Sequence, residues 1–499
     1  MSKIFDEFKE YLEEINHLNH ASTLLYWDME TTMPKAGFKG HSDALAYLST
    51  ETFKRGTGEK MGEFLDKLSA KEEFDALDSD WQYIVKEMKK SYDEDKRIPA
   101  DFFKAYVVAQ NEAGVAWQEA KQKNDFSIFA PHLEKMIEMT KQITEYRKPG
   151  MDIYDALLDR YEEGMDSATY DRVFNSLKEG LLPLLNKILA AKPFDESKFK
   201  QKYDTLAEKE VEHFLLEYIG FSFEKGCTGE TEHPFTLNFN SKDVRVSNHF
   251  REDDAVDPMF SAIHEGGHAI YEQNVAEKLD DTPAGSCEYL GLHESQSRFY
   301  ENVLGRNINF WKPIYGKIQE LQPELKDISL EEFHRYINSV KNSLIRTSAD
   351  EVTYCLHVIV RYEIEKEIFR NNVPVSELPA LWNKKMEEYL HITPPTDSVG
   401  ILQDMHWSDG SFGYFPTYLL GTIYDGMYIE TIEKELGSID TILAEGRIKD
   451  ITKWLNEKIH QYGSTRKPRE VIETVCGREV SAEPILKYFT DKYTKIYNL

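Results

Sequence analysis

Residues 257–273 read DPMFSAIHEGGHAIYEQ, and this stretch decides how the 499-residue chain is interpreted. His264 and His268 lie four residues apart, which places both imidazoles on one face of a helix, one turn apart. Two such rings can bind a single cation, and the carboxylate of Glu265 can accept a proton from a water on that cation. The stretch therefore predicts a catalytic metal-binding helix.

Several neighbouring features support a buried helix here. Asp257 suits the N-cap position, and Pro258 suits the first helical position, where its missing N–H costs nothing. Apolar residues flank the histidines, and buried imidazoles need partners. The pair Gly266-Gly267 is unfavourable inside a helix and indicates that something approaches its backbone closely. The alternative is a core helix whose histidines are only hydrogen-bonded.

A catalytic zinc needs a third protein ligand and an open position. Asn274 stands where a third histidine would lie six residues after His268, so the ligand must come from another element. The next predicted helix, residues 285–306, offers four candidates: Glu288, His293, Glu294 and Glu301. The pattern does not choose among them, and Glu294 can instead pair with Arg298 four residues later.

The rest of the chain is predominantly helical. Apolar residues recur every three or four positions in most segments, including 2–27, 331–370 and 430–461. One exception, residues 233–250, alternates with period two around 240–243 and predicts a β-hairpin. A hairpin alone is marginally stable, so it must pack on something or gain a third strand. With no repeat or flexible linker, we expect one large helical domain.

Composition excludes several classes of function. Lysine and arginine total 60 against 88 acidic residues, a formal net charge of −28, which disfavours nucleic acid and anionic lipid as partners. Four scattered cysteines without CxxC spacing form neither a disulfide framework nor a cysteine zinc site. No leader sequence or membrane-spanning run is evident, so we expect a cytoplasmic protein.

Six motifs occur in order along residues 233–420. They are His233-Pro234-Phe235, Asp243-Val244-Arg245, His264 to His268, His293-Glu294-Ser295-Gln296, Ile345-Arg346-x-x-Ala349-Asp350 and Gly400-x-x-Gln403-Asp404-x-His406-Trp407. In these motifs the chain resembles the M32 metallocarboxypeptidases, the carboxypeptidase Taq family. One position departs from the family pattern: Ser247 stands where the DxRxT motif has threonine, and its hydroxyl is retained.

The resemblance implies the architecture. The fold is expected to be mainly α, a large two-lobed helical metallopeptidase fold with a deep central groove and one small antiparallel β-sheet. Residues 1–499 would form a single M32-type peptidase domain. The resemblance also implies Zn2+ as the cofactor, with Co2+ as a possible substitute, and a homodimer.

The resemblance further assigns roles to individual residues. His264, His268 and Glu294 correspond to the metal ligands, and Glu265 to the general base that activates water. Arg346 is the candidate for holding the substrate's terminal carboxylate, since a guanidinium binds carboxylates with two parallel hydrogen bonds. The alternative is a helix-surface pair between Arg346 and Asp350, which could also orient the arginine.

Polar rings gather in residues 400–418. His406, Tyr414 and Tyr418 can bind substrate or stabilise the oxyanion that forms during peptide hydrolysis. We expect Tyr418 to fill the oxyanion role and Tyr414 to bind substrate, although an aromatic core role remains open for whichever tyrosine is not the oxyanion donor. His233 is either a substrate-site residue or an ordinary strand-end histidine. The hairpin can pair with an extended peptide, which would give broad specificity.

The expected function is zinc-dependent release of single residues from peptide C-termini. Two alternatives remain. One is a helical zinc endopeptidase or aminopeptidase, although a GxMEN-type motif for binding the substrate amine is absent. The other is a non-catalytic peptide-binding protein with a structural metal, which would require four protein ligands.

Overall fold

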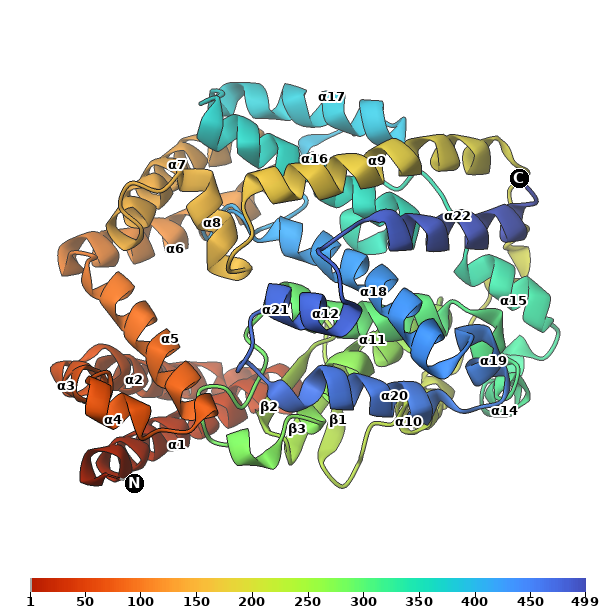
Figure 1. Cartoon of the computed structure of the whole chain (residues 1–499). Helices are drawn as coiled ribbons and strands as arrows, with labels where there is room; N and C mark the ends of the chain where they lie inside the picture. The colour runs from red at the N-terminus through yellow and green to blue at the C-terminus, as the bar shows by residue number, and fades with distance from the viewer. Residues whose placement is uncertain (1) are drawn as a thin grey trace. The chain divides into compact units, whose positions relative to one another are not determined.

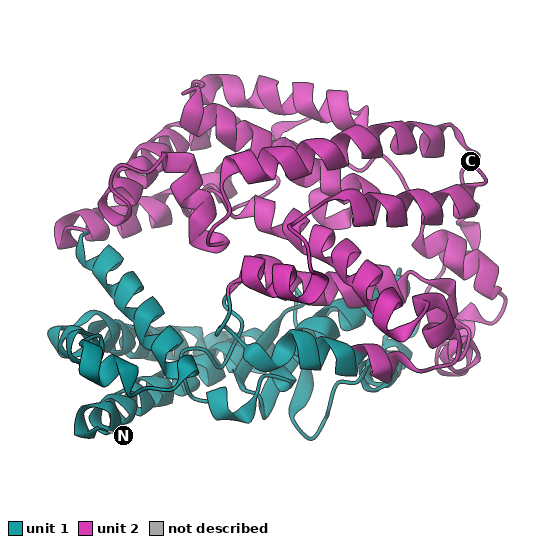
Figure 2. Ribbon diagram, in the orientation of Figure 1, with its two compact units in different colours: residues 1–97, 204–288, 452–466 teal, residues 98–203, 289–451, 467–499 magenta. Residues whose placement is uncertain are grey.

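The computed structural model describes residues 2–499 and is mainly helical, with one three-stranded sheet (Figure 1). The chain divides into two compact units (Figure 2). Unit 1 comprises residues 1–97, 204–288 and 452–466, and unit 2 comprises residues 98–203, 289–451 and 467–499. Helix α20 (Ile448–Lys458) crosses the boundary between them.

Unit 1 holds the sheet and seven α-helices that lie entirely within it. Its elements are α1 (Lys3–Thr31), α2 (Phe38–Thr57), α3 (Glu59–Leu68), α4 (Lys71–Asp75), α5 (Ser79–Lys96), α10 (Thr205–Ile219), β1 (Gly226–Glu230), β2 (Thr236–Asn240), β3 (Asp243–Asn248) and α11 (Val256–Gln273). One apolar cluster joins α1 to α3 and α5, with Phe5, Phe8 and Leu65 almost fully buried. Amphipathic periodicity in residues 2–27 predicts this buried face of α1 correctly.

The sheet confirms the predicted hairpin and corrects its expected type. Strands β2 and β3 pair antiparallel around Asn240 and Asp243. The third strand, β1, runs parallel to β3, so the sheet is mixed and has the order β1-β3-β2. The expectation of a purely antiparallel sheet was wrong because β2 lies between β1 and β3 in the chain, so β3 turns back beside β2 and enters the centre of the sheet in the same direction as β1. Both β2 and β3 pack against α11.

Unit 2 is helical throughout. Its α-helices are α6 (Ala100–Lys123), α7 (Phe126–Arg147), α8 (Ile153–Tyr161), α9 (Ser167–Ala190), α12 (Leu290–Arg298), α13 (Ile308–Trp311), α14 (Tyr315–Leu321), α15 (Leu330–Ile337), α16 (Glu351–Arg370), α17 (Leu378–Leu390), α18 (Phe415–Leu436), α19 (Ile439–Ala444), α21 (Pro468–Cys476) and α22 (Glu483–Tyr497). A π-helical segment, η4 (Phe299–Gly305), continues α12. Helices α16 and α18 are buried on almost every side and pack against each other at the centre of the unit.

The helix predicted over 331–370 is interrupted. Helix α15 ends at Ile337, and α16 begins only at Glu351. Asp350 caps α16 by accepting hydrogen bonds from the N–H groups of Val352 and Thr353, both at 3.0 Å. The intervening segment contains a short 3-10 turn, η6 (Arg346–Ser348), so Arg346 does not lie on an α-helix.

Among residues 2–499, no helix combines the length and the apolar character needed to cross a membrane.

Candidate active site

Helix α11 starts two residues earlier than the sequence predicts, at Val256 instead of Pro258. Asp254, not Asp257, accepts hydrogen bonds from the N–H groups of Val256 (2.9 Å) and Asp257 (3.1 Å). Asp257 therefore lies in the first turn, where its negative charge still favours the helix N-terminus. The prediction of Asp257 as the N-cap was wrong because the helix begins before it: Ala255 is the N-cap, and the Asp254 carboxylate, one residue further back, accepts the hydrogen bonds of the first turn.

His264 and His268 lie together on α11, as their spacing predicts. Their ring centroids are 5.1 Å apart at an angle of 81°. Both rings are half-buried, whereas Glu265 between them is 9% exposed. Two imidazoles on one face beside a carboxylate suit a zinc- or cobalt-type cation, so the donor set on this helix fits the metal that the sequence motif predicts.

Close packing against a neighbouring helix explains why residue 266 is glycine. A Cβ atom at this position would lie 2.6 Å from Ile219 Cδ1 and 2.8 Å from Leu216 Cδ2, both on α10. The close neighbour that the glycine pair indicated is therefore helix α10. This contact fixes α11 against α10 along the face that bears Gly266.

His233, the substrate-site candidate of the hairpin segment, lies outside both strands. His233 precedes β2 and is exposed, and its carbonyl accepts a hydrogen bond from Thr231 Oγ1 at 2.8 Å. Ser247, the departure from the family pattern, is fully buried. Its hydroxyl accepts from the Phe235 N–H at 2.9 Å and donates to the Phe235 carbonyl at 3.2 Å. A threonine would supply the same hydroxyl, so the substitution preserves the link between β2 and β3.

Glu294 lies on α12, in unit 2. Its Oε1 is 3.8 Å from Arg298 Nη1, so the predicted i,i+4 pair is a loose ion pair and not a hydrogen bond. Arg298 instead donates through Nε to Thr422 Oγ1 at 2.8 Å. Helix α18 approaches closely here, since a Cβ on Gly421 would lie 3.2 Å from Glu294 Cγ. The packing of α18 therefore limits where the Glu294 side chain can point.

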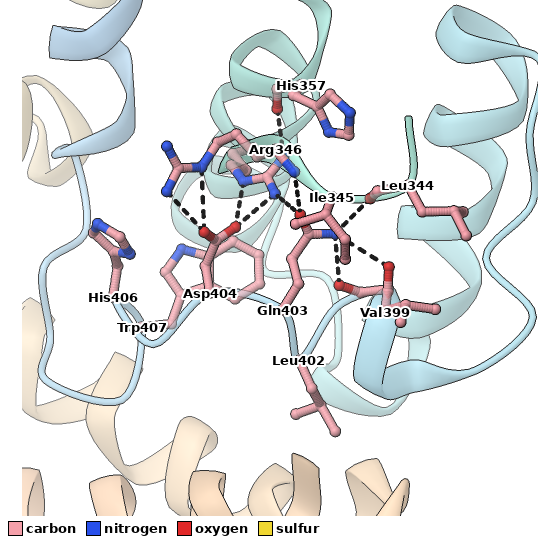
Figure 3. Close-up of polar contacts among 12 residues, drawn as sticks. Leu344, Ile345, Arg346, His357, Val399, Leu402, Gln403, Asp404, His406 and Trp407 are labelled. Carbon is pink, nitrogen blue, oxygen red and sulfur yellow. Dashed lines mark hydrogen bonds and ion pairs between the residues drawn. The ribbon is translucent and has the colours of Figure 1, made fainter. Parts of the chain in front are cut away.

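Arg346 forms its main ion pair with Asp404, and not with Asp350 as the sequence alternative supposed. Arg346 donates to Asp404 Oδ1 through Nε at 3.2 Å and through Nη2 at 2.9 Å (Figure 3). Its Nη1 contacts the Tyr354 hydroxyl at 3.2 Å. The helix-surface pair was wrong because α16 starts after Arg346, and Asp350 is used to cap it.

A second arginine completes this network. Arg361, fully buried on α16, donates through Nε to Asp404 Oδ2 at 2.7 Å and through Nη2 to Gln403 Oε1 at 2.8 Å. Gln403 Oε1 also accepts from the Arg346 N–H at 2.9 Å, and its amide donates to the Leu344 carbonyl at 3.1 Å (Figure 3). One carboxylate thus serves two guanidinium groups, and the network retains a positive charge.

Electrostatics within the network follow from this arrangement. Burial would raise the pKa of Asp404, but the charges of Arg361 and Arg346 outweigh it and hold that pKa below its usual range. Burial also lowers the pKa of His406 to about 4, with Asp404 only partly opposing this. His406 is therefore neutral at neutral pH and can both donate and accept hydrogen bonds.

The predicted aromatic residues are brought together. His406 Nε2 lies 3.4 Å from the Tyr418 hydroxyl, and the Tyr414 and Tyr418 rings are 5.2 Å apart. The Arg346 guanidinium lies over the Tyr418 ring at 4.9 Å. Burial raises the pKa of Tyr418 well above its ordinary value, so its hydroxyl keeps its proton and can donate. Arg346, His406, Tyr414 and Tyr418 therefore form one polar cluster in unit 2.

Glu365 fixes the segment that carries these residues. Its carboxylate accepts from Trp407 Nε1 at 2.9 Å, from the Gly413 N–H at 3.0 Å and from the Tyr154 hydroxyl at 3.1 Å. Burial raises its pKa to about 7 although all three donors favour its charged form. Bonds on both sides of residues 408–412 hold this loop to α16.

Asp404 belongs to one of the sequence motifs, but the sequence does not assign it a role. Arg361 and Glu365 belong to no motif, and their part in the site is not predicted. The sequence does not single out these two, because residues 355–369 carry three further glutamate or lysine residues. The structure separates them: Arg361 and Glu365 are fully buried on α16, where charged side chains are rare without partners, whereas the other three are only partly buried. Such residues need buried partners, and here those partners lie in the 403–413 segment.

Comparison with known proteins identifies the family that this chain matches. The profile of the carboxypeptidase Taq (M32) metallopeptidase family matches residues 7–493. The chain is 43% identical to carboxypeptidase 1 of Bacillus subtilis, covering 99% of this chain and 98% of that protein. It is 35% identical to thermostable carboxypeptidase 1 of Thermus thermophilus, covering 99% of each. A crystal structure of an M32 carboxypeptidase from Deinococcus radiodurans superposes with a TM-score of 0.96 at 30% identity, covering 100% of both chains.

Proposed function

Because the chain belongs to the carboxypeptidase Taq (M32) metallopeptidase family and is thus a metallocarboxypeptidase, we propose that it is a zinc enzyme that removes single residues from peptide C-termini with broad specificity. The observation that carries this proposal is the half-buried pair His264 and His268 with Glu265 between them on α11.

His264, His268 and Glu294 are the proposed metal ligands. Two imidazoles and one carboxylate are a donor set typical of catalytic zinc. Among residues 2–499, these three are the group of histidine, cysteine and acidic side chains suited to hold a metal ion. The bound metal would supply Lewis acidity toward the scissile carbonyl and toward a water molecule.

Glu265 is the proposed general base. Its position next to His264 lets its carboxylate take a proton from the attacking water and return it to the leaving amine. Its low exposure supports this role, because a buried carboxylate is less strongly hydrated than one at the surface.

Arg346 is the proposed anchor for the substrate's terminal carboxylate, and this selects for C-terminal cleavage. The positive charge that remains in the network of two arginines and one aspartate supports the assignment. The Tyr418 hydroxyl is the proposed oxyanion donor, and Tyr414, His406 and His233 are proposed substrate contacts. Strand β2 lies at an edge of the sheet, and backbone pairing with a peptide at such an edge would support broad specificity.

The test is mass spectrometry of an unblocked decapeptide incubated with the metal-loaded protein and with Glu265→Gln. Loss of one residue at a time from the C-terminus, absent in the variant, is the expected result. Internal or N-terminal cuts that still need Glu265 would contradict the carboxylate anchor. An intact peptide under zinc and under cobalt would contradict the enzymatic proposal altogether.

The remaining parts of the proposal concern the metal, assembly and location. Elemental analysis of the protein as purified tests zinc against cobalt. We further propose that residues 1–499 act as one peptidase domain, in a homodimer, in the cytoplasm. Sedimentation at several protein concentrations tests the dimer, and cell fractionation tests the location.

A further inference from the structure

A hydrogen bond links the hairpin to the proposed general base. The hydroxyl of Thr236, the first residue of β2, lies 2.7 Å from Glu265 Oε2 and 2.9 Å from the Glu265 backbone carbonyl. A hydroxyl carries one proton. Because the carboxylate contact is shorter and the acceptor is charged, the proton points to Oε2, where the bond is stronger.

A second contact holds the strand in place. Asn238 lies two residues after Thr236, on the same face of β2, and its Nδ2 donates to Glu272 Oε2 at 2.8 Å. Glu272 lies seven residues after Glu265, two turns further along the same face of α11. Strand β2 therefore contacts α11 at two matched points.

Glu272 is itself held in place. Its Oε1 accepts from Ser286 Oγ at 3.1 Å and from the Cys287 N–H at 3.2 Å, and its side chain is 2% exposed. A buried carboxylate with three donors offers a rigid point of attachment. The Asn238 contact consequently fixes the position of β2 along the axis of α11. This in turn fixes where the Thr236 hydroxyl contacts Glu265.

We propose that Thr236 is a positioning residue for Glu265: its hydroxyl fixes the rotation of the carboxylate that accepts the proton from water. The inference rests on the proposed role of Glu265 as general base. The last torsion of a glutamate is broad and nearly free, so a single bond to one oxygen decides the direction of the other. Thr236 does not contact the substrate or the metal ligands in this assignment.

The experiment compares kcat and KM for C-terminal cleavage of one peptide by the full-length zinc-loaded enzyme and by Thr236→Val, Thr236→Ser and Glu265→Gln. Valine keeps the shape and strand preference of threonine but removes the hydroxyl, and serine keeps the hydroxyl. We expect Thr236→Val to lower kcat about 10-fold with KM changed by less than about 2-fold. Thr236→Ser should restore most of the loss.

A matched control separates this role from general stability. Thr282 also lies in unit 1, and its hydroxyl donates to the Leu279 carbonyl at 2.7 Å, so Thr282→Val removes a hydroxyl bonded to backbone alone. Thermal unfolding and zinc content are measured for every variant. Thr236→Val should keep both, and Thr282→Val should keep wild-type kcat.

The outcomes distinguish the inference from the proposal on which it rests. If Glu265→Gln is inactive while Thr236→Val has wild-type kcat, the positioning role is wrong and the proposed function stands. A rise in KM with unchanged kcat would also overturn it, since that result identifies Thr236 as a substrate contact. If Glu265→Gln remains active, the proposed base role and this inference both fail.

Discussion

Asp404 occupies the Nε edge of Arg346, with hydrogen bonds of 3.2 Å from Nε and 2.9 Å from Nη2. The edge of the guanidinium formed by Nε and Nη2 is therefore already occupied from within the protein. The edge formed by Nη1 and Nη2 remains, and Nη1 also donates to the Tyr354 hydroxyl at 3.2 Å. A peptide carboxylate bound by Arg346 would therefore approach from the Nη1 side.

The two arginines make Asp404 important for stability. We expect Asp404→Asn to lower the free energy of unfolding by about 3 to 5 kcal/mol, because it leaves two buried guanidinium groups without their carboxylate. Urea unfolding followed by circular dichroism measures the change. Asp450→Asn is the control, since this exposed carboxylate pairs only with Arg447 on the surface. A loss no larger than the control's would show that Arg346 and Arg361 find other partners.

Arg346→Lys tests the carboxylate anchor. Lysine keeps the charge but loses the planar fork. If Arg346 binds the terminal carboxylate, kcat/KM for a free-acid peptide should fall about 10- to 100-fold, and the preference over the same peptide with an amidated C-terminus should shrink. Arg306→Lys, at a half-buried arginine paired with Glu301, controls for the cost of altering a guanidinium in an ion pair. An unchanged preference for the free acid would place the anchor elsewhere.

The local parts of the fold could be predicted from sequence because they depend on short-range patterns. Periodicity located α1, alternation located the hairpin, and the spacing of His264 and His268 placed them on one face. The break before α16 was missed because residues 338–350 contain no glycine or proline to mark it. The boundary is marked instead by the Asp350 cap, which begins a new helix, and side-chain caps are weaker signals than chain-breaking residues.

Long-range pairings were the part that sequence could not supply. Asp350 lies four residues from Arg346 and Asp404 lies 58, so periodicity favoured the wrong partner. Thr236 and Glu265 are separated by 29 positions and are joined only when β2 packs on α11. Such contacts are decided by how elements pack, and a single sequence read by itself carries little information about that.

The two tyrosines near His406 should differ in effect. We expect Tyr418→Phe to lower kcat about 100-fold with little change in KM, since its hydroxyl is the proposed donor to the oxyanion. Tyr414→Phe should change kcat less than about 5-fold, because it removes a hydroxyl that acts on Tyr418 and not on the reacting carbonyl. Steady-state kinetics on one peptide decides between them. The reverse ranking would exchange their roles.

Glu162, the residue that ends α8, is fully buried, and burial raises its pKa to about 8 from an ordinary 4.5. Hydrogen bonding from the Gly291 N–H, at the start of α12, only partly offsets this effect. The folded protein therefore keeps Glu162 protonated at neutral pH, whereas the unfolded chain ionises it. This carboxyl lies outside the proposed chemistry, so its titration is visible mainly in stability.

The sign of the resulting pH dependence follows from proton binding. Below about pH 4.5 both states hold the proton, and the favourable contribution of the buried acid is fully present. Between about 4.5 and about 8 only the folded state holds it, so the contribution is lost as pH rises, by at most about 1.4 kcal/mol per pH unit. Glu162→Gln cannot ionise, so its stability relative to wild type should increase across this range. Urea unfolding of both proteins at pH 5, 6.5 and 8 measures the difference, and a difference that stays constant would mean that Glu162 is charged in the folded protein.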